Sequence, residues 1–526
     1  MKHRRRFLTT VVLVVVLVYI SLLLLLMWVE YPEPTSSINT FIDALWYSVA
    51  TLTTVGYGDI APVTPVGRAI GTVFVLLSTG ILVTLVSALI SFLASEGFPL
   101  LRLSFQRKKN WYYFADTGIE STTLARQIYQ SDDQAVIIYG QDRSRMEETP
   151  DYPCLFANVS PERIARHKGS AGNRCSVFFM RENDIGMNPR AVNISSLPVE
   201  VYARTVNGEE MLSGNIHFFH CYECCAREYW RQKPLLRRER RIVLIGFGHY
   251  GAALLKYAIL TNVLSSDHHV AYHIFGDATQ FLQMHNHLDL VFSMQQEAEE
   301  RDSLIFHSTG WAAAHDVLAS ADRIILCDDD EQQGWDIFWH LRRYYCVQGR
   351  IDLRSSRPIP DVSHFGVTSD IYTPEHILRT NLNHVAISMN NLYRSSHPKT
   401  ALDWDQLTDN LRQSKIAASE HLFVKVRILL GDDALTDLTA ETLVQAYAVY
   451  RENIRDPARL EEYRRIEHLR WLRYYIYHNW SYGSVRKPAL RQDPRICPYE
   501  SLAPYEQAYG DYAWELMGEL RLRDDS

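Results

Sequence analysis

The stretch TLTTVGYGD, residues 51–59, decides how the rest of this chain is interpreted. Its two glycines allow backbone angles that aim successive carbonyl oxygens at one axis. Four copies of such a loop form rings of oxygens that replace the water around a potassium ion. A Gly-rich turn on a soluble protein is the alternative, and the flanking segments argue against it. The predicted filter residues are Thr54, Val55, Gly56, Tyr57 and Gly58, with potassium held by the first four.

The segment before the loop is a long apolar run. Phe7 to Val29 holds 23 residues without a charge. At 1.5 Å per residue it is roughly 34 Å long, enough to cross about 30 Å of hydrocarbon. The basic start MKHRRR also fits a signal peptide, but the run is too long and no small-residue cleavage site follows. We predict a retained first membrane helix with its N-terminus in the cytosol.

A second apolar run follows the loop. It extends from Val66 to Ala94, is broken only by Arg68, and is followed by the basic sequence LRLSFQRKKN. With two crossings, this cluster and the basic start MKHRRR lie on the same side of the membrane, which is the positive-inside pattern. We predict a multi-pass protein of the cell (inner) membrane with both termini cytoplasmic. The acidic residues on the opposite side are Glu30, Glu33 and Asp43.

Between the apolar runs, Phe41 to Thr53 is too short to cross and suits a re-entrant half-helix. Together with the TVGYG loop, this arrangement resembles the potassium-channel pore, in which Trp46 and Tyr47 fall on the aromatic cuff around the filter. A simple membrane anchor needs no such loop between its helices. The resemblance implies a homotetramer in the lipid bilayer, because one filter loop per chain requires four chains around one axis.

The support behind the filter departs from the family pattern. Ala50 stands where some members carry a carboxylate, so Asp59 lacks that partner. From the spacing, we predict that the indole N–H of Trp46 supports Asp59 instead.

The inner end of the pore also shows departures. Ser78 aligns with the usual hinge glycine, and the nearest glycine is Gly80, so the bend is displaced or absent. Glu96 either forms an acidic ring that concentrates cations at the inner mouth or is simply solvated. Both alternatives stay open.

Composition bounds the remaining chain. Of 526 residues, the pore uses about the first 100, and more than 400 remain for further domains. A net charge of −7 gives no reason to expect a nucleic-acid partner. The eight cysteines follow the second apolar run, and CYECC resembles half a zinc site without a second ligand pair. Structural thiols are favoured over zinc or redox sensing for Cys221, Cys224 and Cys225.

Residues 101–237 predict a doubly wound α/β domain. Short apolar runs that read as buried parallel strands alternate with helical stretches. The turn after the first run retains only Gly118 of a Gly-x-Gly-x-x-Gly pattern, and Asp116 puts a negative charge where a pyrophosphate normally sits. We expect no dinucleotide there, but a cation or a structural role. The predicted strands are Trp111–Ala115, Ala135–Tyr139, Cys154–Asn158, Cys175–Met180 and Val199–Thr205.

Residues 238–400 repeat the module with an intact glycine motif. Gly246, Gly248 and Gly251 follow an apolar strand and open a helix, which is the context that a dinucleotide motif requires. Asp277 ends the next strand and is placed to bind ribose hydroxyls. We predict an NAD-like nucleotide here, and the alternative is that the glycines serve only packing.

The later strands of this domain are predicted at Ser303–His307 and Arg323–Cys327, and an acidic run, Asp328 to Glu331, follows the second of them. Such a run can bind calcium, but helix capping and solvation are favoured.

A filter pore followed by two such modules resembles channels with tandem RCK domains, the regulators of potassium conductance, also called TrkA-N domains. The resemblance covers roughly residues 40–390. It implies that four chains supply eight domains to a cytosolic gating ring, which a small-molecule ligand reshapes. The linker that pulls on the inner helices would be roughly Ser95 to Asn110.

Residues 401–526 change character, with Trp, Tyr, Arg and Glu at helical spacing. The sequence from Arg465 to Met517 resembles the RyR domain, a helical repeat named for ryanodine receptors. Its aromatic faces beside Arg473 and Lys487 suit a base and its phosphates, and we predict a cyclic dinucleotide as ligand. The alternative is that these aromatics form a core. The candidate ligand residues are His468, Trp471, Trp480, Tyr482 and Arg486.

Two function classes follow. The favoured one is a ligand-gated potassium channel with no enzymatic activity. The other is a membrane-anchored nicotinamide-dependent enzyme or a nucleotide sensor without conduction, which leaves the filter without a purpose and lacks a paired acid, base or nucleophile. Gating by voltage is disfavoured because no Arg-repeat helix is present.

Overall fold

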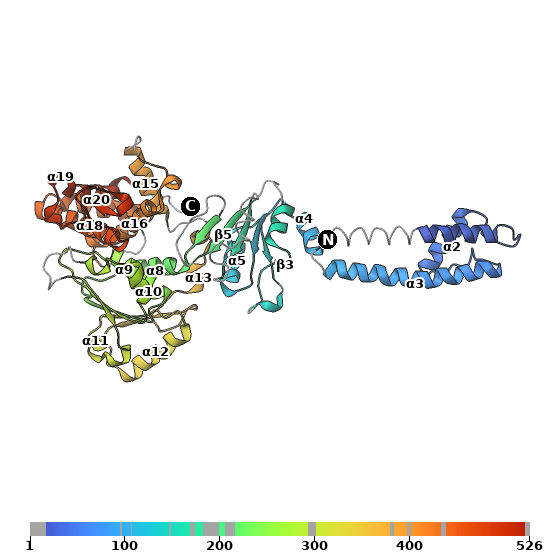
Figure 1. Ribbon diagram of the computed structural model, residues 1–526, viewed down its shortest axis with the longest axis horizontal. Coiled ribbons are helices and arrows are strands. Elements are labelled where there is room, and N and C mark those ends of the chain that lie inside the picture. The colour runs from blue at the N-terminus through green and yellow to red at the C-terminus, as the bar shows by residue number, and fades with distance from the viewer. Residues whose placement is uncertain are drawn as a thin grey trace. The chain divides into compact units, whose positions relative to one another are not determined.

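The computed structural model divides into two compact units, Met1–Phe105 and Gln106–Ser526 (Figure 1). Each unit is described by itself. The structure describes residues 17–94, 97–106, 108–141, 143–146, 149–168, 174–181, 199–205, 216–292, 301–378, 383–396, 401–432 and 438–520.

The first unit contains a helix over residues 17–30, then α2 (Phe41–Leu52), α3 (Pro65–Ala94) and α4 (Gly97–Ser104). The α2 helix is the expected half-helix, and a capping box starts it. Thr40 accepts a hydrogen bond from the Asp43 N–H, and Asp43 accepts one from the Thr40 N–H at 2.8 Å. Within the described residues, no helix combines the length and the apolar character needed to cross a membrane.

Three predictions on this unit fall partly or wholly outside what the structure describes. Residues 7–16 of the first predicted membrane helix and Glu96 lie outside the described residues. Ser78 and Gly80 lie within α3, but their surroundings are not described. The two membrane crossings and the hinge therefore stay predictions.

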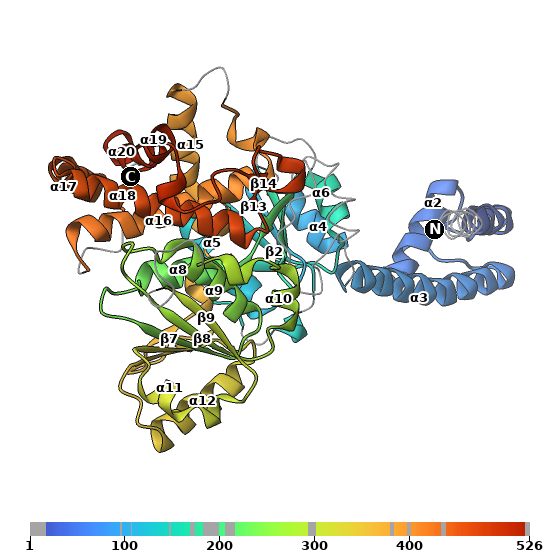
Figure 2. The same cartoon turned by 60° about the vertical axis from the view of Figure 1, so that its left-hand side comes forward.

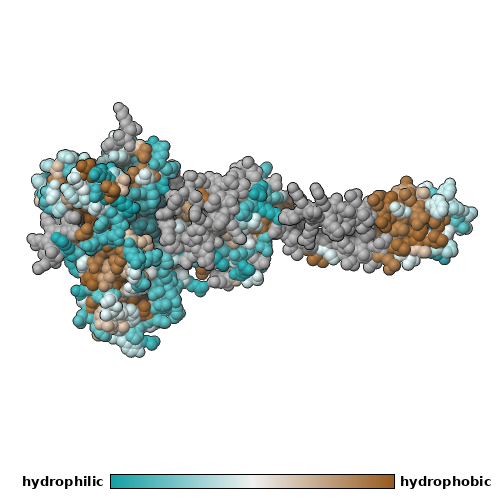
Figure 3. All heavy atoms as spheres, in the orientation of Figure 1, coloured by the Kyte–Doolittle hydropathy of each residue, from teal (hydrophilic) through white to brown (hydrophobic). Residues whose placement is uncertain are grey.

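Apolar side chains cover much of the described surface of the first unit (Figure 3). A small core of Leu23, Leu26, Ile38, Ala44 and Phe74 lies beneath them. An apolar surface of this extent marks contact with lipid or with other chains. Its large exposed residues include Leu17, Val18, Ile20, Leu24, Leu25, Trp28, Ile42, Val66, Val73, Val75 and Leu76.

The second unit contains two six-stranded parallel sheets with the same winding. The first has the order β3-β2-β1-β4-β5-β6 and the second the order β12-β11-β10-β7-β8-β9. Each is the doubly wound order 3-2-1-4-5-6 of a Rossmann-like domain, so the predicted fold class is confirmed for these domains. The first sheet consists of β1 (Asn110–Phe114), β2 (Ala135–Tyr139), β3 (Cys154–Phe156), β4 (Cys175–Phe179), β5 (Glu200–Arg204) and β6 (Ile216–Phe219). The second consists of β7 (Arg241–Ile245), β8 (Ala271–Phe275), β9 (Ser303–His307), β10 (Arg323–Leu326), β11 (Arg350–Arg354) and β12 (His364–Phe365).

The helices of these domains follow the strands. In the first domain they are α5 (Ile119–Ser131), α6 (Pro161–Lys168) and α8 (Cys221–Gln232). In the second they are α9 (His249–Thr261), α10 (Thr279–Met284), α11 (His315–Ala319), α12 (Glu331–Tyr344), α13 (Thr368–Ile371) and α14 (Pro374–Ile377). The α8 helix packs against α9, so the last helix of the first domain also belongs to the core of the second.

The C-terminal part is mainly helical. It contains α15 (His384–Ser396), α16 (Asp409–Leu430), α17 (Ala440–Asn453), α18 (Pro457–Tyr477), α19 (Pro504–Gln507), α20 (Tyr509–Glu519) and the short strands β13 (Ser481–Tyr482) and β14 (Gln492–Asp493). The second sheet has α11 and α12 on one side and α9 and α10 on the other (Figure 2). The α16 and α18 helices pack on α9 and form a further layer there.

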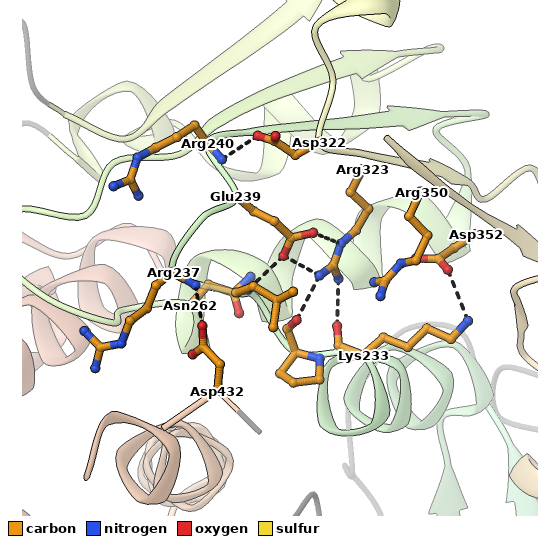
Figure 4. A network of polar contacts seen from close by, with 12 residues as sticks. Lys233, Arg237, Glu239, Arg240, Asn262, Asp322, Arg323, Arg350, Asp352 and Asp432 are labelled. Atoms are coloured by element: carbon orange, nitrogen blue, oxygen red, sulfur yellow. Dashed lines mark hydrogen bonds and ion pairs between the residues drawn. The ribbon is translucent and has the colours of Figure 1, made fainter. Parts of the chain in front are cut away.

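A buried arginine fixes the connection between the two α/β domains (Figure 4). Arg323 begins β10 and is fully buried. Its Nε donates to Glu239 at 2.8 Å, and its terminal nitrogens donate to the carbonyl oxygens of Lys233 and Pro234 at 2.7 and 2.8 Å. The segment that follows α8 is thereby held against the start of β10, an interior strand of the second sheet.

A buried carboxylate holds the end of α8 to β11. Asp352 accepts a hydrogen bond from Lys233 at 3.1 Å (Figure 4). It also accepts one from the Tyr229 hydroxyl at 2.7 Å. Burial by itself raises the pKa of Asp352, but Arg350 and Lys233 together with its hydrogen bonds bring the pKa below its ordinary value. Asp352 therefore stays ionised and keeps α8 in place.

We expect Glu239→Gln to lower the stability of the second unit by about 3 kcal/mol, because it leaves the Arg323 charge buried without its counter-ion. The measurement is the thermal unfolding midpoint of the purified full chain in detergent. The matched control is the double variant Arg323→Met, Glu239→Leu, which removes both charges and recovers most of the loss. Equal midpoints for the single and double variants would contradict this account.

Candidate functional site

The loop after α2 has an alternating backbone. The φ angles of Thr54, Gly56 and Gly58 are +57°, +58° and +74°, and no residue between them has a positive φ. In a β-strand, successive peptide groups point to opposite sides of the backbone. Where left-handed and right-handed residues alternate, successive peptide groups point to the same side. Glycine adopts such angles freely, but Thr54 does so at a cost of roughly 1–3 kcal/mol.

The N–H groups of this loop point back to the pore helix. The N–H groups of Val55 and Gly56 donate to the carbonyl oxygen of Ala50 at 3.0 and 3.1 Å. Among the described residues, no N–H or O–H group donates to the backbone oxygens of Thr54 through Tyr57. The peptide groups are thus anchored by their donors, and their oxygens are left for another partner.

Trp46 braces the outer end of the loop from α2. Its indole Nε1 donates to the Asp59 carboxylate at 3.1 Å, so the predicted hydrogen bond is present. The same indole stacks on the ring of Tyr57, with centroids 5.9 Å apart and planes 8° from parallel. One side chain therefore fixes both Tyr57 and Asp59. Tyr47 packs edge-on against Phe74 of α3 and lies away from this contact.

A buried carboxylate closes the outer turn of the same unit. Glu30 ends the helix over residues 17–30 and is fully buried. It accepts hydrogen bonds from the Ser36 hydroxyl at 2.7 Å, the Val63 N–H at 3.1 Å and the Thr64 N–H and hydroxyl at 3.0 and 2.6 Å. A Cβ at Gly67 would lie 1.9 Å from its Oε1, so a glycine is required there. Glu30 thus joins the first helix to the start of α3, just beyond the filter loop.

The intact glycine motif of the second α/β domain contains an internal anion. Asp329, from the loop after β10, accepts hydrogen bonds from the N–H groups of His249 at 3.0 Å and Tyr250 at 3.2 Å. Its carboxylate also contacts the His249 ring at 2.8 Å, and a Cβ at Gly248 would lie 2.5 Å from its Oδ2. The N-terminus of α9, where the phosphates of a dinucleotide were predicted, is capped by this carboxylate.

The other predicted residues of this nucleotide site are Gly246, Gly251 and Asp277. Gly246 has a φ of +85°, and a Cβ there would lie 2.6 Å from Asp328. A Cβ at Gly251 would lie 3.0 Å from the Phe247 ring and 3.2 Å from the Cys327 sulfur, a tight fit. Asp277 is exposed after β8, and its pKa is lowered by the hydroxyl and N–H of Thr279. It is therefore an ionised acceptor at the end of the second strand.

The first α/β domain fills the equivalent position with its own loop. Asp116 is buried, and its Oδ1 accepts from the Gly118 N–H at 2.8 Å and the Ser121 hydroxyl at 2.9 Å. The Nε of Arg181 lies 3.7 Å from the same oxygen. Both glycine loops are therefore occupied by a carboxylate of the chain itself.

The candidate ligand residues of the C-terminal part are mostly engaged within the chain, and the rings of His468 and Trp471 stack with centroids 6.1 Å apart. Trp480 is buried against Tyr475, and the Nε2 of His468 donates to the Cys497 carbonyl oxygen at 2.8 Å. The pKa of His468 is lowered, chiefly by burial. Tyr482 is 60% exposed, and Arg486 pairs with the buried Asp493 at 3.2 Å.

Two further cations are already engaged. Arg495 lies over the Trp471 ring at 5.0 Å and pairs with Asp493 at 2.7 Å. Arg473 is buried and paired with Asp302. Of the predicted ligand residues, Tyr482 and Arg486 are the exposed ones, and Tyr482 is the exposed aromatic.

The cysteine cluster lies in the core. Cys221, Cys224 and Cys225 lie on α8 and are buried. Burial raises the pKa of Cys224 and of Cys225 well above the ordinary value of a thiol. Protonated thiols are poor metal ligands, so the geometry favours packing. No group of metal-binding side chains lies among the residues that the structure describes.

Comparison with known proteins identifies the N-terminal region. The sequence model of the ion-channel family, described as "Ion channel", matches residues 7–95. A voltage-gated potassium channel of Aeropyrum pernix is 63% identical over 43 residues, which is 8% of this chain and 15% of that protein. A calcium-gated potassium channel of Thermoplasma volcanium is 36% identical over 58 residues, 11% of this chain and 17% of its own. The human potassium voltage-gated channel subfamily A member 10 is 49% identical over 43 residues, 8% of each chain.

The chain therefore carries an ion-channel domain whose filter segment is similar to those of potassium channels, followed by two Rossmann-like domains. The chain spans less than a fifth of the length of these relatives. They are channels and not enzymes, and an ion-channel domain places the protein in a membrane.

Among solved structures, the GsuK channel is similar over most of its length. The ADP-bound form is 15% identical with a TM-score of 0.33, covering 66% of this chain and 88% of that one. The NAD-bound form is 14% identical with a TM-score of 0.31, covering 66% and 76%. Because these TM-scores are low, the similarity to the GsuK structures carries no argument about the function of this chain.

We expect Trp46→Phe to speed the decay of current under sustained opening about fivefold. The phenyl ring keeps the stacking on Tyr57, but the variant loses a hydrogen bond worth about 1 kcal/mol to Asp59. Currents of the reconstituted channel in planar bilayers measure the decay. Trp28→Phe, an exposed tryptophan outside the loop, is the matched control. Unchanged decay in Trp46→Phe would show that the hydrogen bond does not support the filter.

Proposed function

We propose that this protein is a potassium-selective channel, a homotetramer of the cell (inner) membrane with both termini cytoplasmic, gated by a small molecule that binds its cytosolic part. One observation carries the conduction proposal. The backbone of Thr54 to Gly58 alternates in handedness, its donors bind the pore helix, and its oxygens have no donor within the described chain. Four such loops supply the rings of oxygen that dehydrated potassium needs.

The two Rossmann-like domains supply the gating apparatus in this proposal. They correspond to tandem RCK domains, and eight of them form a ring beneath the pore. A ligand opens the pore only to the extent that it binds the open ring more tightly than the closed one. The tight joint at Arg323 lets the two domains of one chain move together.

The proposed ligand sites are those that the sequence indicated. An NAD-like nucleotide at Gly246, Gly248 and Gly251, with its ribose on Asp277, must displace the Asp329 carboxylate from α9. A cyclic dinucleotide is the candidate for the RyR-like C-terminal part, with Tyr482 as the exposed aromatic. Calcium at the acidic run is less favoured, because Asp329 and Asp330 already cap α9 and α12.

Potassium flux tests the conduction proposal. Liposomes that contain the wild-type chain are expected to release potassium, and Gly56→Asp is expected to abolish this release. A side chain at 56 strains a residue with a positive φ and places a charge among the oxygens. The matched control is Gly310→Asp, at a glycine with open space and outside the first unit, which should conduct normally. Flux that persists in Gly56→Asp would refute the proposed role of the loop.

The nucleotide proposal makes a separate prediction. Asp329→Ala is expected to raise the affinity for ADP about tenfold, because it removes a negative charge and a competing acceptor from the α9 N-terminus. Calorimetry on the full chain in detergent measures the affinity. Asp330→Ala, which removes the cap of α12, is the matched control and should change little. An unchanged or lower affinity in Asp329→Ala would contradict displacement of this carboxylate.

A further inference from the structure

The Asp329 carboxylate is held on α9 by a side chain as well as by the backbone. The Nδ1 of His249, the first residue of α9, lies 2.8 Å from its Oδ2. A carboxylate only accepts hydrogen bonds, so the imidazole donates to it. Together with the N–H groups of His249 and Tyr250, the carboxylate takes three donors from the start of one helix.

The His249 ring is itself held by the first α/β domain. The ring of Tyr222, in the first turn of α8, stacks on it with centroids 4.9 Å apart and planes 16° from parallel. Tyr222 is buried, whereas 54% of the His249 side chain is exposed. The buried ring therefore fixes the rotamer of the exposed one, and the direction in which His249 donates depends on a residue of the other domain.

Tyr222 also supports the backbone of the Asp329 loop. It packs edge-on against Tyr250, with centroids 4.7 Å apart. The Arg354 guanidinium lies over the Tyr250 ring at 4.7 Å. It donates to the carbonyl oxygens of Asp328 at 2.7 Å and Asp329 at 3.0 Å. Both the carboxylate and the main chain of Asp329 are therefore connected to Tyr222 through side chains of the second domain.

The other side of Tyr222 leads to the first glycine loop. A terminal nitrogen of Arg204, at the end of β5, donates to the Tyr222 hydroxyl at 3.4 Å. Its other terminal nitrogen lies 3.7 Å from the carboxylate of Glu120, in the first turn of α5. Because α5 and α9 each begin at a glycine loop, these contacts connect the two loops across the boundary between the domains.

We infer that Tyr222 and His249 are positioning residues for the nucleotide site of the second glycine loop. They hold the Asp329 carboxylate on α9, and a phosphate reaches the N–H groups of that helix only where the carboxylate leaves. The affinity for a nucleotide then depends on the relative position of the two α/β domains, and a nucleotide favours the position in which Tyr222 no longer holds His249. The nucleotide rests on the proposed function, but the hold on Asp329 does not.

Two measurements on the full chain in detergent test this inference. Calorimetry gives the affinity for ADP, and mass spectrometry gives the rate of hydrogen exchange at the His249 and Tyr250 N–H groups. His249→Phe keeps a ring for Tyr222 but cannot donate to Asp329, so it is expected to raise the ADP affinity about fivefold, as for the loss of one hydrogen bond, and to speed the exchange. Tyr222→Leu, which keeps apolar volume but loses the stack, is expected to change both in the same direction.

The double variant His249→Phe, Asp329→Ala is expected to bind ADP no more tightly than Asp329→Ala alone, because His249 acts through that carboxylate. The matched control is His315→Phe. His315 is also the exposed first residue of a helix, and it stacks on Tyr345 with centroids 5.1 Å apart and planes 16° from parallel. The same change made there should alter neither measurement.

Wild-type affinity and wild-type exchange in both His249→Phe and Tyr222→Leu would overturn the inference, and if Asp329→Ala still raises the affinity, the nucleotide proposal stands without it. A further rise in affinity when His249→Phe is added to Asp329→Ala would also contradict it. Faster exchange in His249→Phe, Tyr222→Leu and Asp329→Ala, with no binding of ADP to any of them, supports the positioning role and contradicts the nucleotide proposal alone.

Discussion

The filter loop depends on a constraint of the backbone: its N–H groups are bound and its oxygens are not. The Ala50 carbonyl oxygen at the end of α2 takes the N–H groups of Val55 and Gly56, and the positive φ angles at alternate positions set the direction of the oxygens. A carbonyl without a donor costs free energy once it is removed from water, so a loop enclosed in an assembled pore needs something that replaces the missing donors. In the proposed channel, a dehydrated cation between four such loops replaces these donors.

The rest of the first unit holds this strained loop in place. Trp46 binds both Tyr57 by stacking and Asp59 by a hydrogen bond, and Glu30 joins the outer turn to the start of α3.

The second unit also has backbone polar groups that need partners, and there the chain itself supplies them. The free N–H groups at the start of α5 and α9 receive carboxylates of the chain, Asp116 and Asp329, in place of a phosphate. A ligand of the second glycine loop therefore competes with a covalently attached anion.

The sequence predicted the elements whose signals are local. All the predicted strands of the two sheets are present, as are the half-helix of α2 and the hydrogen bond from Trp46 to Asp59, because apolar runs and fixed spacing determine them.

Three strands of the two sheets were not predicted. The sequence of β11 alternates Arg350, Asp352 and Arg354 with apolar residues and reads as exposed. Asp352 is buried because Lys233 and Arg350 pair with it, and Arg354 is buried because it donates to the carbonyl oxygens of Asp328 and Asp329. The strands β6 and β12 are too short or too mixed in composition to be predicted. The sequence identified Asp329 only as one residue of the acidic run from Asp328 to Glu331. It caps α9, which begins 80 residues earlier in the chain, and no local sequence pattern reveals such a tertiary contact.

The most direct test of the account is a high-resolution cryo-electron microscopy map of the purified protein in potassium. The account predicts four chains around one axis, with residues 54–58 of each facing it and a column of separate ion densities between their backbone oxygens. It also predicts that the column changes when sodium replaces potassium. A monomer with this loop lying flat on its surface, or a tetramer whose axis holds no ion density in potassium, would contradict it.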